Sequence, residues 1–215
     1  PATVGRFQAP LGGLQIGGGS ERVEIRRNVI DGGNGNGITL GSIRWISAVI
    51  VVTFWEATFL GLNDQVLFPF VSFDEDGCPE IDPDPQPPNG PDGNPLIPVS
   101  EGALREIRIV DNEIRRMGVN GIAVARISTG RARILIFDLV VEWNRIEDCM
   151  GLLLRDSPSL ATTAFGGIVL HDCEEFTCRL NRIQRNGRAR GGPVVGVYVG
   201  SGEALVFEEN HIVEN

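Results

Sequence analysis

The stretch Val23-Glu24-Ile25-Arg26-Arg27-Asn28-Val29-Ile30 sets a pattern that returns four more times along the chain. In each copy, apolar residues stand five and three positions before an asparagine, and an isoleucine follows two positions after it. The asparagines of the five copies are Asn28, Asn112, Asn144, Asn181 and Asn210. A shorter pattern, glycine-apolar-any-apolar, alternates with the first one. Its copies begin at Gly13, Gly37, Gly121, Gly167 and Gly196.

The spacing of the two patterns defines a repeat of 23 to 24 residues, because the shortest glycine-to-asparagine distance is 14 and the shortest return distance is 9. A unit this short cannot bury its own apolar side and must stack on its neighbours. Apolar and polar residues alternate in each run, which is the period of a strand. Parallel strand connections are right-handed. The sequence therefore predicts an all-β fold, a right-handed parallel β-helix (solenoid) of about five coils, as one domain over residues 1–215.

Aligning the five copies on their asparagines predicts which side chains point inward. The apolar rows form the core, and Cys178 falls in one of them. We expect the asparagine amides to stack from coil to coil at a turn, where asparagine also tolerates a left-handed backbone. The outward rows alternate in charge, so the turn row should form a ladder of ion pairs, each stabilising by less than about 1 kcal/mol. Its members are Arg116, Asp148, Arg185 and Glu214.

The net charge of -9 is concentrated in one segment. Residues 45–104 hold ten acidic residues and no Arg or His, while the remainder carries 19 Arg against 18 acids. An acidic segment on a nearly neutral body argues against nucleic acid as a partner. The sequence contains no uninterrupted run of eighteen apolar residues, so it predicts no membrane span. The sequence begins without Met and ends where the next glycine strand would follow, so we expect a segment of a longer protein.

A long insertion, residues 41–100, interrupts the second coil. Its apolar first half leads to a predicted hairpin across Asp74–Gly77, and Asp82–Pro98 reads as an extended, proline-rich loop. A smaller insertion at 126–133 falls at the same corner of the third coil. Loops on a solenoid concentrate function because the stacked coils position them. The corner after the glycine strand is therefore the first place to look for a site.

The four cysteines do not form an evident disulfide framework. Cys178 is predicted to be a small buried hydrophobe. Cys149 and Cys173 do not occupy equivalent positions of the repeat, and Cys78 lies in the insertion. Two alternatives remain open: four free thiols, or one bridge that involves Cys78.

The Asn-any-Ile and Gly-Ile-any-Val rows, over residues 13–40 and 105–215, resemble the repeats of the pectin lyase-like superfamily. They are also similar to bacterial right-handed β-helix repeat proteins. The resemblance implies the parallel β-helix fold, a polysaccharide ligand and a location outside the cell or on its surface. The Asp-Pro-His-Glu motif of the epimerases and the paired Asp-Asp of the polygalacturonases have no counterpart here. The chain also has no Lys for a lyase, so no catalytic residue of the superfamily carries over.

One predicted constellation joins a base, an acid and a cation at the insertion corner: His171, Asp172 and, one coil earlier, Arg126. A lyase that acts on uronates needs a base near the acidic proton and a cation on the carboxylate. The alternative is a solvated His–Asp pair in a turn.

Two further groups in the insertion are candidates for binding. Asp74, Asp76 and Glu80 could hold calcium, which prefers several oxygens from a flexible loop; the alternative is a solvated hairpin turn, with no cofactor. Trp45 and Trp55 could stack on sugar rings; the alternative is packing of the insertion against the coils.

These observations lead to two functional hypotheses. The first is a non-enzymatic β-helix scaffold or carbohydrate-binding segment of a larger bacterial or phage-like protein. The second is a polysaccharide lyase or glycoside hydrolase. In both, residues 41–100 are expected to meet a polysaccharide or a protein partner.

Overall fold

The computed structural model describes residues 13–47, 70–73, 79–82, 96–125, 134–151, 153–154, 165–187 and 194–215. Every regular element in these ranges is a β-strand. In the same ranges, no helix has the length and apolar character that crossing a membrane requires.

The glycine pattern forms the first strand of each coil. These strands are β1 (Leu14–Ile16), β4 (Ile38–Leu40), β11 (Ile122–Val124), the first part of β15 (Phe165–Arg179) and the first part of β17 (Val194–Glu203). They pair in parallel and in order, with one residue of each coil facing its equivalent in the next. The predicted one-coil stacking is therefore confirmed for this row.

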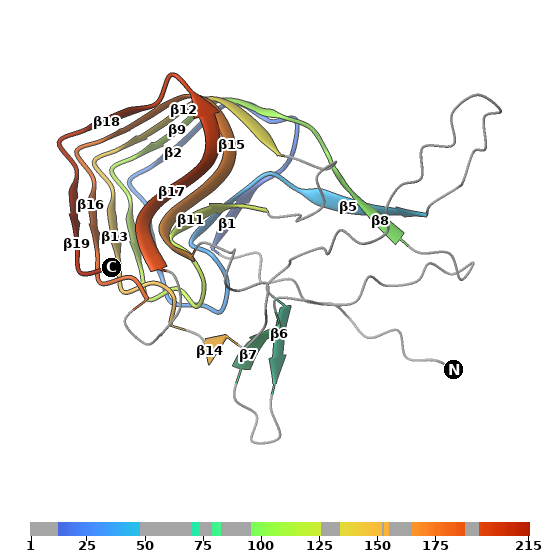
Figure 1. Cartoon of the computed structure of the whole chain (residues 1–215), viewed down its shortest axis with the longest axis horizontal. Helices are drawn as coiled ribbons and strands as arrows, with labels where there is room; N and C mark the ends of the chain where they lie inside the picture. Colours follow the sequence, from blue (N-terminus) through green and yellow to red (C-terminus); the bar gives the residue numbers. More distant parts are fainter. Residues whose placement is uncertain are drawn as a thin grey trace.

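The asparagine pattern forms the other two strands of each coil. Before the asparagine lie β2 (Glu21–Arg26), β9 (Leu104–Val110), β12 (Leu135–Glu142), the second part of β15 and β18 (Val206–Glu208). After it lie β3 (Val29–Asp31), β10 (Glu113–Arg115), β13 (Arg145–Glu147), β16 (Arg182–Gln184) and β19 (His211–Val213). Both sets are parallel and in register. Figure 1 shows the coils lying side by side as nested outlines. The fold is the predicted parallel β-helix.

The inward rows form one continuous core, as predicted. Ile107, Ile109 and Ile114 of the second coil are fully buried, and so are their equivalents in the third and fourth coils, Cys178 included. The fifth coil differs, because Phe207 and Ile212 are 48% and 44% exposed. No described strand stacks beyond it.

The glycine that opens each first strand is required by the approach of two sheets. A Cβ on Gly121 would collide with Cγ2 of Ile146, which stands two residues after the asparagine of the same coil. The same glycine–isoleucine collision occurs in all five coils. The two repeat patterns are therefore complementary halves of one packing arrangement, in which the isoleucine methyl fills the space that a glycine leaves.

Three turns in each coil hold a residue with a left-handed backbone, and the predicted asparagine is not that residue. In the third coil the left-handed residues are Asp138, Trp143 and Asp148, with φ of 55°, 58° and 53°. Trp143 directly precedes Asn144, so the expectation of a left-handed asparagine is wrong by one position. The amide of Asn144 must face its neighbours in the ladder, and the preceding residue makes the bend.

The predicted asparagine ladder is confirmed. Nδ2 of Asn112 donates to Oδ1 of Asn144 at 3.0 Å, and Nδ2 of Asn144 donates to Oδ1 of Asn181 at 3.1 Å. A second ladder was not predicted. Nδ2 of Asn186 donates to Oδ1 of Asn215 at 2.8 Å, and the backbone N–H of Cys149 donates to Oδ1 of Asn186 at 3.0 Å.

The predicted ladder of ion pairs in the turn row is only partly present. Arg185 and Asp148 form a two-point contact, with Nε–Oδ1 and Nη2–Oδ2 distances of 2.8 Å. Arg116 does not turn toward Asp148 as predicted; it contacts Asp31 through Nε and Nη2. The long arginine side chain reaches a neighbouring row, so sequence spacing alone does not choose its partner.

The insertion begins and ends as an antiparallel pair, β5 (Ile43–Ser47) with β8 (Leu96–Ser100). β8 contains Leu96, Ile97 and Pro98, so the predicted loop 82–98 is wrong at its end. Two chain segments that leave and re-enter one corner lie side by side and can pair. The predicted hairpin is confirmed as β6 (Phe70–Phe73) with β7 (Pro79–Asp82), and β7 also pairs with β14 (Leu153–Leu154).

Candidate functional site

The residues that the sequence singled out are only partly within the described structure. Arg126, Trp55, Asp74 and Asp76 lie outside the described residues. Trp45 lies in β5 and Glu80 in β7, where only the strand pairing is described. The predicted calcium and tryptophan sites therefore stay predictions.

His171 and Asp172 lie where β15 turns the insertion corner. Both are half-buried. The ring of His171 meets Tyr198 of the next coil edge-on, with centroids 6.1 Å apart at 69°. Asp172 instead lines an open groove on the outer surface. Neighbouring side chains of a strand point to opposite sides, so His171 and Asp172 lie in different surroundings.

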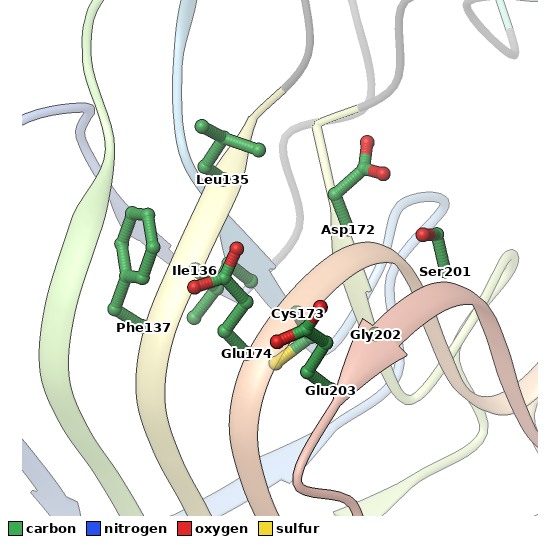
Figure 2. A pocket seen from close by; sticks show the side chains of 9 residues that line it. All are labelled: Leu135, Ile136, Phe137, Asp172, Cys173, Glu174, Ser201, Gly202 and Glu203. Atoms are coloured by element: carbon green, nitrogen blue, oxygen red, sulfur yellow. The ribbon is translucent and has the colours of Figure 1, made fainter.

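The groove crosses three coils at this corner and has a volume of about 330 Å³. It is built from the equivalent residues of β12, β15 and β17, and Figure 2 shows their side chains. The lining residues are Leu135, Ile136, Phe137, Asp172, Cys173, Glu174, Ser201, Gly202 and Glu203. The groove is thus a product of coil stacking, and no single stretch of sequence contains it.

Two rows of side chains form the walls of the groove. Leu135, Asp172 and Ser201 face one another across adjacent strands. Phe137, Glu174 and Glu203 form the second row in the same register. Between these rows the floor is Ile136 and Cys173, each 1% exposed, and Gly202. The walls run from apolar at the third coil to acidic at the fourth and fifth.

The acidic end of the groove stacks like charges. Glu174 lies directly opposite Glu203, and adjacent strands are roughly 4.8 Å apart. Neither carboxylate has an ion pair or a side-chain hydrogen bond in the described part of the chain. Figure 2 shows both projecting from the same side of β15 and β17. Directly opposed like charges destabilise a sheet, so this pair is a cost that the rest of the coil offsets.

At the other end of the groove, Phe137 is covered by a cation. The guanidinium carbon of Arg105 lies 4.3 Å from the centroid of the Phe137 ring. One ring face is therefore occupied, and the edge of the ring together with Leu135 remains to contact a ligand. Leu135 is 40% exposed.

This arrangement favours some kinds of chemistry over others. Carboxylates accept hydrogen bonds from hydroxyl groups, and their charge opposes the entry of anions. Cys173 on the floor is not a nucleophile at neutral pH, because burial raises the pKa of its thiol to about 12. Among the described residues, no group of three or more His, Cys, Asp or Glu side chains is arranged to hold a metal ion.

Sequence reasoning found the corner but missed most of the groove. Of the nine lining residues it named only Asp172 for a role in a site. The signal was present: the two walls stand nine and seven positions before each asparagine, in the same alignment that located the core. Glu174 and Glu203 share a row, and opposed acids in one row can be read from that alignment.

Comparison of the chain with protein families, with curated proteins and with solved structures gives no match.

Proposed function

We propose that this chain is a β-helical scaffold segment that binds a neutral carbohydrate in the groove across the third, fourth and fifth coils. The observation that carries the proposal is the opposed pair Glu174 and Glu203, which has no cation partner among the described residues. In contrast, Glu142 and Glu147 are each held by arginines. Two acceptors that are not engaged by the protein remain for the hydroxyl groups of a ligand.

The direction of the groove supports a linear ligand. The groove follows the stacking axis, so equivalent wall residues recur at each strand, roughly every 4.8 Å. A sugar ring in an extended chain is of similar length, so successive rings would meet successive coils. The apolar edge of Leu135 and Phe137 offers contact to the C–H face of a ring. The carboxylates at the acidic end of the groove oppose the binding of anionic uronate polymers. The proposed ligand therefore differs from the substrate of a polyuronate lyase.

Other parts of the proposal rest on the resemblance and on the insertion. The likeness of the repeats to the pectin lyase-like superfamily supports a place outside the cell or on its surface, in a larger bacterial or phage-like protein. Residues 41–100 leave the coil that precedes the groove, so a polysaccharide or protein partner of the insertion would lie near the same corner.

A glycoside hydrolase is the second candidate, and the same pair favours it. Hydrolases of this kind use two carboxyl groups, and in retaining enzymes these stand roughly 5 to 5.5 Å apart. Glu174 and Glu203 extend from directly opposed strand positions about 4.8 Å apart. One would protonate the leaving oxygen and the other would attack or stabilise the sugar. If the protein is a hydrolase, Glu174→Gln alone and Glu203→Gln alone should each abolish hydrolysis while the polysaccharide still binds.

The test is affinity gel electrophoresis and calorimetry with soluble neutral polysaccharides, a glucan, a mannan and a xylan, and with polygalacturonate as the anionic comparison. Wild type should bind a neutral polymer, and Glu174→Gln combined with Glu203→Gln should weaken that binding at least tenfold. Glu175→Gln is the matched control, since Glu175 is exposed on the same strand but does not line the groove. Equal binding by all three proteins, or a preference for polygalacturonate, would contradict the proposal. New reducing ends would identify the hydrolase.

A further inference from the structure

The outer face of the third sheet carries two arginines in direct register. Arg145 of β13 faces Arg182 of β16, and His211 of β19 continues the row. The side chains of Arg145 and Arg182 are 53% and 56% exposed. Two like charges on adjacent strands repel each other, so their stacking needs a compensating group.

That compensating group lies beneath them. The side chain of Glu147 is 5% exposed, and its Oε1 lies 2.7 Å from Nε of Arg145 and 3.4 Å from Nε of Arg182. Nε of Arg182 also donates to Oε1 of Gln184 at 2.9 Å. Both guanidiniums are therefore anchored through Nε, on the side nearest the sheet.

Anchoring through Nε leaves the Nη edge of each guanidinium available. Within the described residues, neither Arg145 nor Arg182 makes a hydrogen bond through its Nη atoms. Three other arginines of this sheet and its turns differ. Arg115 uses Nη1 on Glu113, and Arg116 and Arg185 use Nη2 on aspartates. Within the described ranges, Arg145 and Arg182 stand in direct register, and neither uses its Nη edge on another protein group.

We propose that Arg145 and Arg182 form a binding site for a tetrahedral oxyanion, a sulfate or phosphate group seated between the two Nη edges. Guanidinium edges donate two parallel hydrogen bonds to such oxygens, and a tetrahedral group has enough oxygens to accept from both. The sheet holds the two backbone positions one strand apart, roughly 4.8 Å, and the contacts of both Nε atoms with Glu147 fix the inner side of each guanidinium before the ligand arrives. This site lies on a different sheet from the groove and does not depend on the function proposed for it.

The surroundings restrict which oxyanion carriers fit. On the β10 side of Arg145 stands Glu113, and the last coil places Glu209 and Glu214 in the bordering turns. Together with the net charge of -9, these acids oppose a polymer with many negative charges. The site therefore suits a single oxyanion, free or as an ester on a neutral carrier, better than a nucleic acid. Trp143, 59% exposed, borders the same corner two residues before Arg145.

The test compares inorganic sulfate, inorganic phosphate and a sugar phosphate by calorimetry and by the shift of the melting temperature, at matched ionic strength in sodium chloride. Arg145→Gln and Arg182→Gln should each weaken oxyanion binding about tenfold, the loss of one charge-assisted contact. Arg116→Gln is the matched control, because that guanidinium is already committed to Asp31. The substituted residues are half-exposed, and an unchanged circular dichroism spectrum will show that each variant folds.

Each outcome decides the proposal. Binding of the inorganic ions and the sugar phosphate alike identifies the oxyanion as the whole ligand, while tighter binding of the sugar phosphate identifies a carrier. Both results support the site if they are lost in the two variants and kept in the control. A response equal to that of chloride, or one that persists in Arg145→Gln and Arg182→Gln, shows screening alone and overturns it. Single-stranded DNA is titrated in the same way, and its tight binding would overturn the choice of ligand.

Discussion

Asn144 and Asn181 lie one coil apart, and both the backbone N–H and Nδ2 of Asn144 donate to Oδ1 of Asn181, at 2.9 and 3.1 Å. Nδ2 of Asn144 also donates to the carbonyl of Ile109 at 2.8 Å, and its Oδ1 accepts two hydrogen bonds from Asn112. The Asn144 side chain thus satisfies two backbone groups of the preceding coil and bonds to the side chain of Asn181 on the following coil. Because these groups are buried, their pairing is a condition for stacking.

Replacing Asn144 by Ala should lower the free energy of unfolding by about 3 kcal/mol or more, because it leaves buried donors and acceptors on two coils unpaired. Asn28→Ala is the control. Asn28 is half-buried and donates to Asn112, and its own Oδ1 accepts no hydrogen bond from another described residue, so its loss should cost about 1 kcal/mol. Urea unfolding followed by circular dichroism measures both. Equal losses would mean that the ladder does not hold the coils together.

The left-handed turn residues predict a reversal of the usual effect of glycine. Glu175 has φ of 57° and is exposed, so Glu175→Gly should be neutral or stabilise by up to about 1 kcal/mol, because glycine relieves the strain of that region. The neighbouring Glu174→Gly should be less stable than Glu174→Ala by about 0.5 to 1 kcal/mol, since Glu174 has an ordinary strand backbone and both changes remove the repulsion from Glu203. Melting temperatures of these variants give the comparison. A destabilised Glu175→Gly would show that its side chain has a role that the turn does not explain.

The buried thiols predict a loss of stability at alkaline pH. Burial raises the pKa of Cys149, Cys173 and Cys178 to about 12, against roughly 8.5 in an unfolded chain. The thiols therefore stay protonated to a higher pH in the folded state than in the unfolded state. Their contribution to the free energy of unfolding is complete below about pH 8.5 and falls as pH rises from there toward 12. The expected slope is on the order of 1 kcal/mol per pH unit for each thiol. Urea unfolding at a series of alkaline pH values measures it, and lysine titration does not interfere, since the chain has none.

Cys178→Ala should have a shallower slope, which assigns the effect to the thiols. The same three residues are free and buried, so a bridge from Cys78 to any of them is excluded in this structure. A thiol reagent at pH 7.5 should leave all three unmodified until the protein unfolds. Fast modification of Cys178 in the folded protein would contradict its place in the core.

Glu147 predicts a loss of stability at acid pH. Burial alone would raise the pKa of Glu147, but the close contact of Arg145 and the charges of Arg145 and Arg185 outweigh it, so the pKa lies below its usual value. A carboxyl whose pKa is lowered by folding stabilises above its unfolded pKa, about 4.3, and loses that contribution as pH falls through the folded value. Glu147→Gln should destabilise at pH 7 by about 2 kcal/mol, because three arginines lose the buried carboxylate that they contact.

Glu113→Gln is the control for this change, since Glu113 pairs with Arg115 on the same sheet at 30% exposure and its loss should cost less than about 1 kcal/mol. Unfolding curves at pH 7 and pH 3 separate the two. If Glu147→Gln costs no more than Glu113→Gln, the buried carboxylate does not organise the arginines above it.

Removing the insertion tests whether it belongs to the folding unit. The backbone N–H of Glu101 donates to the carbonyl of Ser42 at 3.1 Å, and Ser42 Oγ lies 2.5 Å from Glu101 Oε2. The two ends are therefore adjacent, and a short Gly-rich turn in place of residues 43–100 should close the second coil without strain. We expect the shortened protein to keep its β-sheet spectrum and to lose any association that residues 41–100 mediate. Failure to fold would make the insertion part of the core.

Much of the fold follows from the sequence, because the contacts between coils of a solenoid recur at the repeat length, and this repeat is visible in the sequence. Aligning the asparagines placed Ile114 beside Ile146 and Cys178 in the core, since each coil pairs with the next in one register. The same alignment could have given the groove, where Glu174 and Glu203 share a row. The glycine of each coil was recognised as a marker, but its reason, the methyl of the facing isoleucine, is a contact between two sheets that the period does not describe.

Only the tertiary structure shows which partner a long side chain reaches and in which direction an amide points. Arg116 pairs with Asp31 and Arg185 with Asp148, although the two arginines occupy the same turn row, because a flexible side chain selects its partner by distance rather than by position in the repeat. The bend lies on Trp143 and not on Asn144, because the amide must point along the stack. The sequence by itself determined the period, the strands and the inward rows, which are set by backbone geometry. The contacts of the polar side chains also depend on the three-dimensional structure: Glu174 and Glu203 lie opposite each other without an ion pair among the described residues, and Arg145 and Arg182 contact Glu147 through Nε.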